Sequence, residues 1–150
     1  MKGYVAIGAE GISKPMNVGA LMRTANAVGA SFVFSVQAAD RTKIANLSDT
    51  SRTFKNVPYY AWESMDEMVF PKGCQLVGIE LTDDAVELPE FKHPRMAAYV
   101  LGPERGSLSP EMVAKCDHVV KIPTKFCINV SLAGALVMYD RVRSLGAWRD

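Results

Sequence analysis

The segment Ile122–Asp140, IPTKFCINVSLAGALVMYD, predicts a strand end, a short loop and a helix in direct succession. Asn129 is suited to cap this helix, because its side-chain oxygen can accept hydrogen bonds from the first free backbone N–H groups. From Val130 to Tyr139 the helix is apolar on nearly every side, so we expect it to be buried on more than one face. The alternative for Asn129 is a role as helix cap and nothing more.

The same order of strand and helix recurs along the rest of the chain. Most apolar runs are continuous rather than alternating, which indicates buried parallel strands. The predicted strands are Tyr4–Ile7, Ser31–Val36, Val57–Trp62, Gln75–Leu81, Ala97–Leu101 and His118–Ile122. The predicted helices are Val18–Val28, Lys43–Asp49, Glu63–Phe70, Pro110–Lys115 and Val130–Ser144. This order predicts one α/β domain over residues 1–150 with a mostly parallel sheet.

Composition excludes several classes of protein. The 150 residues are 49% hydrophobic and 22% charged, with a net charge of +1, so any basic surface for nucleic acid must be local. The longest apolar run, LAGALVMY, is far shorter than the roughly 18 residues of a membrane span. Three cysteines without a C-x-x-C pair and two histidines give neither a disulfide framework nor a zinc site. We expect a cytoplasmic protein with reduced thiols, no metal and no membrane partner.

The acidic segment Glu80–Glu90, ELTDDAVELPE, contains five acids and no base. Its composition predicts a solvated loop, with a functional role as the alternative.

The segment Met16–Ala30, MNVGALMRTANAVGA, predicts an amphipathic helix with Asn17 as N-cap and Gly29 as C-terminal breaker. The expected core stripe consists of Val18, Leu21, Met22, Ala25 and Val28. The opposite half holds small residues and one arginine, Arg23, where a solvated face would carry several charges. Small residues suggest that another surface comes close. The alternative is that Arg23 extends from a packed helix to solvent or pairs with a carboxylate.

The segment Leu101–Met112, LGPERGSLSPEM, follows a strand and turns into a helix that begins with Ser109 and Pro110. A glycine-bearing loop at the carboxyl end of a parallel strand is where α/β sheets bind ligands. The loop is neither G-x-G-x-x-G nor a lysine-bearing phosphate loop, which disfavours nicotinamide dinucleotides and nucleoside triphosphates. The alternative is a simple turn between strand and helix.

Together the three segments resemble the motifs of the SpoU-type (TrmH-like) RNA ribose 2'-O-methyltransferases of the SPOUT superfamily. The residues that match the first motif are Asn17, Gly19, Arg23 and Ala25; those of the second are Gly102, Glu104 and Gly106. The third motif, Ile-Pro and then Ser-Leu-Asn-Val-Ser, corresponds to Ile122, Pro123 and Cys127–Ser131. The first serine of this motif is Cys127 here, so a direct hydroxyl role at this position is in doubt.

The resemblance implies a Rossmann-like sheet with helices on both faces and a deep C-terminal trefoil knot that holds S-adenosylmethionine. It implies a homodimer with the active site near the subunit interface and an RNA substrate, tRNA ahead of rRNA. The cofactor residues implied are Glu80, Gly102, Ile122, Cys127 and Ile128. The chain has no room for a separate RNA-binding extension, so we expect a phosphate-contacting strip at Arg41, Lys43, Arg52 and Lys55.

The implied reaction is attack of a ribose 2'-oxygen on the sulfonium methyl group. We assign Arg23 to the phosphate and the developing alkoxide, because a neutral guanidine at pH 7 would cost about 7 kcal/mol. We assign Asn129 to orienting the ribose or cofactor, and Glu104, with Asn17, to the shape of the site. Three rivals remain: a non-catalytic RNA-binding or assembly protein of the same fold, a base methyltransferase, and a flavodoxin-like ligand binder.

Overall fold

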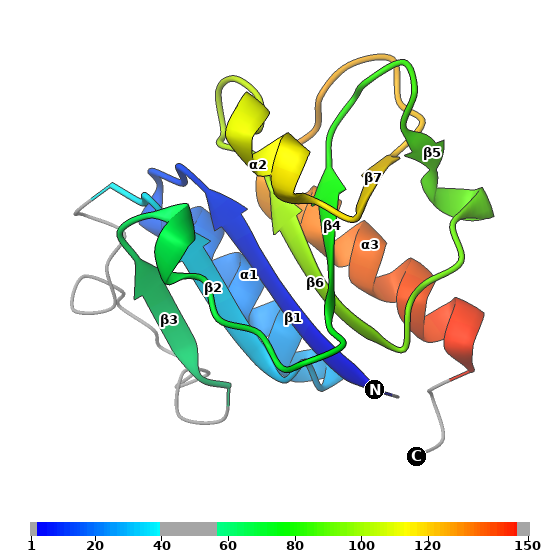
Figure 1. Ribbon diagram of the computed structural model, residues 1–150, viewed down its shortest axis with the longest axis horizontal. Coiled ribbons are helices and arrows are strands. Elements are labelled where there is room, and N and C mark those ends of the chain that lie inside the picture. The colour runs from blue at the N-terminus through cyan, green and yellow to red at the C-terminus, as the bar shows by residue number, and fades with distance from the viewer. Residues whose placement is uncertain (1–2, 40–56, 147–150) are drawn as a thin grey trace.

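The computed structural model describes residues 3–39 and 57–146, which form one twisted sheet with helices on both faces (Figure 1). The strands are β1 (Tyr4–Glu10), β2 (Phe32–Val36), β3 (Tyr59–Trp62), β4 (Gln75–Ile79), β5 (Val86–Glu87), β6 (Met96–Leu101) and β7 (His118–Lys121). They lie in the order β3-β2-β1-β6-β4-β7-β5, and all six strand pairings are parallel. The predicted mostly parallel α/β sheet is confirmed.

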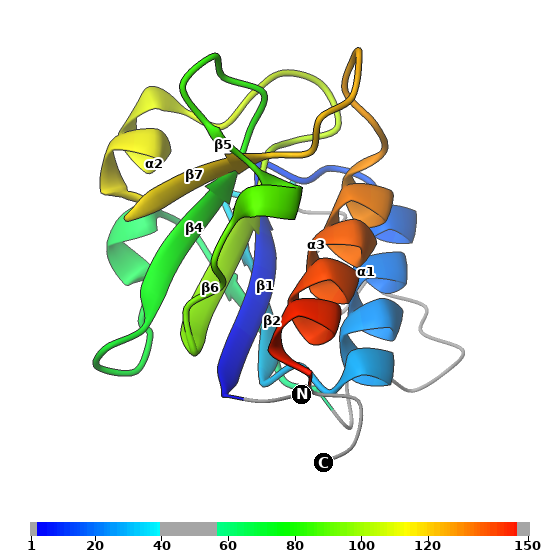
Figure 2. The same ribbon diagram turned by 90° about the vertical axis from the view of Figure 1, so that its right-hand side faces the viewer.

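Two helices, α1 (Pro15–Val28) and α3 (Val130–Leu145), pack side by side on one face of the sheet (Figure 2). The predicted stripe of α1 is buried except for half-buried Val28. At the crossing of the two helices, Gly134 of α3 has no side chain to separate them. A Cβ there would lie 2.5 Å from Leu21 Cδ1, so the close packing of α1 and α3 requires this glycine.

The opposite face of the sheet is covered by α2 (Pro110–Lys115) and by an aromatic cluster. The predicted helix Glu63–Phe70 is wrong: only the 3₁₀ turn η4 (Met65–Glu67) forms there. Pro71 disfavours helical backbone at Phe70. Extended backbone after η4 brings the Phe70 ring to 5.4 Å from that of Phe34. Packing against the sheet thus outweighs the local helical pattern.

The acidic segment after β4 also differs from its prediction. It is not wholly a loop, because β5 pairs with β7 and the 3₁₀ turn η5 (Leu88–Glu90) buries Leu88. Strand β1 extends to Glu10, three residues beyond the predicted end, because it stays paired with β2 as far as Glu10 and Val36; the buried Glu10 carboxylate is hydrogen-bonded to Ser109. The predicted helix Lys43–Asp49 lies outside the described residues.

The start of α1 lies earlier than predicted, so Asn17 is not the N-cap. Lys14 is the N-cap and Pro15 is the first helical residue, where a missing N–H costs nothing. Asn17 therefore lies inside the first turn, buried, with its amide free to bond to other loops. The end of the helix is as predicted, since Gly29 adopts φ 78°.

Helix α3 is buried on one face only within a single chain, contrary to expectation. Leu132, Leu136 and Tyr139 are 61%, 45% and 56% exposed. The small-residue face of α1 is exposed beside it, and a Cβ on Gly19 would meet nothing within 4 Å. Two neighbouring helices therefore present an uncovered surface of apolar and small residues. In the part of the chain that the structure describes, no helix is long and apolar enough to cross a membrane.

Candidate active site

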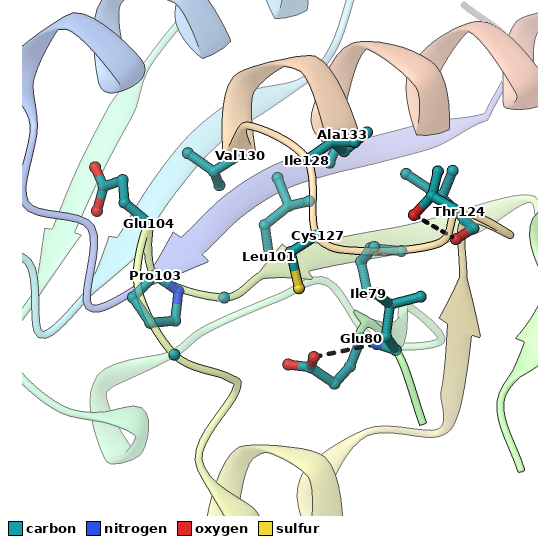
Figure 3. Close-up of a pocket in the computed structure, with 14 residues that line it drawn as sticks. Ile79, Glu80, Leu101, Pro103, Glu104, Thr124, Cys127, Ile128, Val130 and Ala133 are labelled. Atoms are coloured by element: carbon teal, nitrogen blue, oxygen red, sulfur yellow. Dashed lines mark hydrogen bonds between the residues drawn. The ribbon is translucent and has the colours of Figure 1, made fainter. Parts of the chain in front are cut away.

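A pocket opens at the carboxyl edge of the sheet, between the loops that follow β4, β6 and β7 (Figure 3). Its cavity volume is about 150 Å³, and its mouth is open to solvent. All five predicted cofactor residues line it: Glu80, Gly102, Ile122, Cys127 and Ile128. The remaining wall is mainly apolar, from Ile79, Leu81, Leu101, Pro103, Val130 and Ala133. Residues up to 54 positions apart in the sequence, Ile79 and Ala133, therefore meet around one cavity.

Glu104 joins the loop after β6 to the start of α1. Its carboxylate accepts hydrogen bonds from the backbone N–H of Ser13 (2.9 Å) and Lys14 (2.9 Å) and from the Asn17 side-chain amide (3.0 Å). Burial alone would raise the pKa of this carboxyl, but the hydrogen bonds from Asn17 and the backbone outweigh burial and hold the pKa below its ordinary value. Glu104 is therefore a fixed anion, and its carboxylate is already engaged by these donors.

Asn129 continues this chain of contacts into α3. Its Oδ1 accepts from the backbone N–H of Ser131 (2.9 Å) and Leu132 (3.2 Å), which confirms the predicted N-cap. Its Nδ2 donates to Asn17 Oδ1 at 3.2 Å. The amide of Asn129 is thus more than a cap, because the hydrogen bonds between Glu104 and Asn17 and between Asn17 and Asn129 connect all three predicted motifs beside the pocket.

Two further carboxylates hold the loop between β6 and α2, which lines the pocket. Their roles were not predicted from the sequence. Glu80 Oε2 accepts from the backbone N–H of Leu108 at 2.7 Å, and Glu10 accepts from both the N–H and the hydroxyl of Ser109 at 2.7 Å. A signal for Glu10 was present, since one acid ends the apolar run YVAIGAE. The loop between β6 and α2 is therefore anchored to the ends of both β1 and β4.

Gly102 and Cys127 define how much space the pocket offers. A Cβ on Gly102 would lie 3.2 Å from the backbone nitrogen of Leu108, so a larger residue would disturb the Glu80–Leu108 hydrogen bond. Figure 3 shows the Cys127 sulfur directed into the middle of the pocket, between Leu101 and Glu80. The thiol is exposed, so it occupies the wall where the resembling family carries a serine.

Arg23 is not brought to this pocket within one chain. It is exposed on α1, eight residues or about 12 Å along the helix from Pro15, and it does not line the cavity. Within the described residues it makes neither a hydrogen bond nor an ion pair. It lies on the uncovered face that α1 shares with Leu132, Leu136 and Tyr139 of α3.

The predicted RNA strip, Arg41, Lys43, Arg52 and Lys55, lies outside the described residues. Over residues 3–39 and 57–146, the side chains form no group of three or more His, Cys, Asp or Glu residues that could hold a metal ion.

Comparison with known proteins gives a family match over nearly the whole chain. The model of the SpoU rRNA Methylase family matches residues 4–139. The tRNA (guanosine(18)-2'-O)-methyltransferase of Escherichia coli K12 is 31% identical over 140 residues. The match covers 89% of this chain and 61% of that enzyme, so the chain spans about three fifths of the length of this curated relative.

Solved structures share the fold at lower identity. The SpoU methyltransferase AviRb from Streptomyces viridochromogenes, solved with AdoMet, superposes with a TM-score of 0.84 at 21% identity. It covers 98% of this chain, which covers 62% of AviRb. A structure solved to explain 2-OH methylation of C/U34 on tRNA gives a TM-score of 0.75 at 22% identity, over 97% of this chain and 93% of the other.

Proposed function

Because the chain belongs to the SpoU rRNA Methylase family, we propose that it transfers a methyl group from S-adenosylmethionine to a ribose 2'-hydroxyl of RNA, tRNA ahead of rRNA. One observation carries the proposal: the five predicted cofactor residues line one pocket beside the connected side chains of Glu104, Asn17 and Asn129. The name of the Escherichia coli relative, a tRNA (guanosine(18)-2'-O)-methyltransferase, supports tRNA and a ribose 2'-oxygen as the target. We take residues 1–150 as one catalytic domain acting in the cytoplasm.

The residues of the pocket fit S-adenosylmethionine. Apolar side chains such as Ile79, Leu101 and Ile128 suit the faces of an adenine, and Gly102 contributes to the same wall. The anionic Glu80 suits a ligand that carries positive charge. When bound, this cofactor supplies an activated methyl group on a sulfonium. The protein's part is to hold the group and the ribose in line, which needs fixed loops.

The Glu104 carboxylate and the Asn129 amide fix these loops by hydrogen bonds. Glu104 holds the start of α1 against the loop after β6, and Asn129 holds the start of α3 against Asn17. Such preorganised polar groups need no rearrangement during the reaction. We assign Asn129 to orienting the ribose or the cofactor, and Glu104 with Asn17 to keeping the three loops in register.

We extend the proposal to a deep trefoil knot formed by the segments after β6 and β7. The superposition on AviRb over 98% of the chain supports it, as does the meeting of both loops at one pocket. Single-molecule pulling from both termini tests it, because a knotted chain stays shorter at full extension than an unknotted chain of 150 residues. Full extension would refute the knot.

The uncovered face of α1 and α3 supports a homodimer. Apolar side chains that are half or more exposed, Met16, Leu132 and Tyr139, lie on two helices that pack together. A surface of this kind on a small domain marks a protein interface. Sedimentation at micromolar concentration should give twice the mass of the chain, and a monomer throughout that range would contradict the dimer.

Within this dimer, we assign Arg23 to the pocket of the partner subunit. Its place on the uncovered face, away from its own pocket, supports the assignment. The test mixes two inactive variants, Arg23→Ala and Gly102→Val, the second of which crowds the Leu108 backbone and distorts the pocket wall. In mixed dimers one intact pocket meets one intact arginine, so about a quarter of the parent activity should return in a random mixture. No return of activity would mean that Arg23 acts within its own chain or not at all.

The proposed RNA strip of Arg41, Lys43, Arg52 and Lys55 predicts a weaker salt dependence of RNA binding when all four charges are reversed. Binding of S-adenosylmethionine should not change. A quadruple variant that binds RNA like the parent would remove the strip from the proposal.

Two measurements separate the remaining rivals. Stabilisation by S-adenosylmethionine in a thermal-shift titration excludes a flavodoxin-like binder of other ligands. Methyl transfer to bulk tRNA then separates an enzyme from a relative that keeps the fold without turnover. Binding of cofactor and RNA with no methyl transfer would favour the non-catalytic RNA-binding or assembly protein.

A further inference from the structure

The loop between β7 and α3 carries an exposed phenylalanine directly beside the pocket. This loop extends past the ends of the strands (Figure 2). Phe126 is 74% exposed, although its neighbours Thr124, Cys127 and Ile128 all line the cavity. Phe126 itself is absent from the lining, so its ring lies on the outer side of the same loop. An aromatic ring is therefore held at the rim of the pocket and in contact with water.

The backbone that carries this ring is fixed rather than free. Thr124 donates its N–H to the Ile122 carbonyl (2.7 Å) and its hydroxyl to the carbonyl of Phe126 (2.8 Å). Pro123 restricts the turn further. Two residues after Cys127, Asn129 fixes the start of α3. Single exposed apolar residues are common on protein surfaces, but this one is held by hydrogen bonds on both sides at the mouth of the pocket.

We propose that Phe126 stacks on a base of the RNA substrate, at or next to the nucleotide whose ribose enters the pocket, and that Lys125 contacts its phosphate. This inference rests on the proposed function. A 2'-hydroxyl in the pocket leaves its base and the adjoining phosphates at the mouth, where Phe126 and Lys125 lie exposed. Base stacking on aromatic side chains requires an unpaired nucleotide, so the target is expected in a loop or single strand.

The charge beside the ring favours RNA over a second copy of the chain. Lys125 is exposed, and lysine is depleted in protein–protein interfaces while it commonly contacts phosphates. The surface assigned above to the dimer is instead an apolar row on α3. Its residues Leu132, Leu136 and Tyr139 are one helical turn apart. The ring of Phe126 also needs little ordering on binding, because its backbone is already fixed.

The test compares Phe126→Ala, Phe126→Tyr and a matched control, Val69→Ala, which removes another exposed apolar side chain (73% exposed) away from the pocket. Direct binding of labelled bulk tRNA is the main measurement. Phe126→Ala should weaken tRNA binding about 5- to 150-fold, whereas Phe126→Tyr and Val69→Ala should stay within roughly twofold of the parent. Affinity for S-adenosylmethionine and sedimentation mass should not change.

Phe126→Trp adds a spectroscopic readout. An indole at this position should show fluorescence quenching on addition of tRNA, beyond that of the two native tryptophans measured in the parent. Unchanged tRNA affinity in Phe126→Ala would overturn the proposal. A change in dimer mass would instead assign Phe126 to the interface, and a change in cofactor affinity would assign it to the pocket. If the parent binds tRNA but transfers no methyl group, the proposed function fails while the binding assay still decides on Phe126. If the parent binds no tRNA, the same comparison is made with bulk rRNA, and binding of neither RNA would refute both proposals.

Discussion

Helix α3 is attached to the domain by two polar networks, one near each end, and the two differ in what surrounds them. At its start, Asn129 contacts Asn17, which contacts Glu104, at the rim of the pocket where Asn129 is exposed. Toward its end, Asp140 and Arg141 contact His93 and Tyr99 in a site where Arg141 is fully buried. The first network retains access to ligands, whereas the second is closed to them.

The buried network has one consistent arrangement of protons. His93 Nε2 lies 2.7 Å from Asp140 Oδ2, and His93 Nδ1 lies 2.7 Å from the Tyr99 hydroxyl. Arg141 donates to that hydroxyl at 3.0 Å, so Tyr99 accepts from Arg141 and donates to His93 Nδ1. A neutral imidazole that donates from Nε2 to Asp140 completes the network. The imidazole, the phenol hydroxyl and the Asp140 carboxylate are thus hydrogen-bonded to one another or to Arg141, which indicates a structural role for this end of α3.

Arg141→Met disrupts the buried network and has the largest expected effect, a loss of stability. Arg141 donates to the carbonyls of Pro94 (2.6 Å) and Arg95 (2.8 Å) and to Tyr99, and all three would lose a charged donor in a buried site. We expect the free energy of unfolding in urea to fall by about 3–4 kcal/mol. Arg143→Met, whose side chain is 59% exposed, is the control and should change it by less than about 0.5 kcal/mol. An equal effect of the two changes would contradict the contrast.

Arg23→Ala should have the opposite profile, a large loss of activity with little loss of stability. An arginine that stabilises the developing alkoxide acts only in the transition state, so kcat should fall about 10²- to 10³-fold, or about 2.7–4 kcal/mol. Arg23→Lys should also be poor, because an ammonium cannot reproduce the planar guanidinium. Cofactor affinity, dimer mass and methyl transfer are measured on the same preparation. A lower melting temperature, with activity lost only in proportion to unfolded protein, would make Arg23 structural.

The buried histidine should make stability depend on pH. Burial lowers the pKa of His93 below its ordinary 6.5, and outweighs the Asp140 carboxylate, which raises it. Between the lowered pKa and 6.5 the unfolded chain binds more protons than the folded protein, so acidification favours unfolding. We expect the free energy of unfolding to fall from about pH 7.5 to about pH 5.5, with a smaller fall in His93→Gln. The same slope in the parent and in His93→Gln would refute the prediction.

The smallest effect is expected at Cys127. Cys127→Ser restores the hydroxyl of the resembling family in the pocket wall and should keep or slightly raise methyl transfer, since neither side chain is required as a nucleophile. A bulky thiol reagent should block cofactor binding in the parent but not in Cys127→Ser. The other thiols are less reactive, because burial raises the pKa of Cys116 to about 11 and also raises that of Cys74. Loss of turnover in the serine variant would instead make the thiol essential.

The same contrast explains what could be predicted from sequence. The residues Glu104, Asn17 and Asn129 could be predicted as site residues because they belong to three short motifs that follow predicted strands, and parallel sheets bind ligands at the ends of their strands. The buried network was missed, because His93 and Asp140 are 47 positions apart and nothing local marks Arg141 as buried. A lone arginine on a helix is normally assigned to the surface. Only the packed structure shows that its guanidinium meets two carbonyls.

The elements of the fold were predicted where local pattern and packing agree. Helix α2 has the predicted bounds, Pro110–Lys115, because Ser109 accepts from Met112 N–H and Pro110 fills the first position. At Glu63–Phe70 the local helical pattern and the packing disagreed, and packing of the aromatic cluster determined the backbone conformation. The sequence pattern predicted that α3 is buried on more than one face, but a single chain leaves Leu132, Leu136 and Tyr139 exposed. Which surface covers them depends on a second molecule and is beyond a single-chain pattern.

The proposed role of the pocket beside Glu104, Asn17 and Asn129 is methyl transfer to a ribose. The most direct measurement incubates the protein with S-adenosylmethionine that carries an isotope-labelled methyl group and with bulk tRNA, digests the RNA to nucleosides, and locates the label by mass spectrometry. We predict label on a ribose 2'-oxygen with the parent protein and almost none with Arg23→Ala. Label on a base, or no label from a protein that binds both cofactor and tRNA, would contradict methyl transfer to a ribose 2'-oxygen.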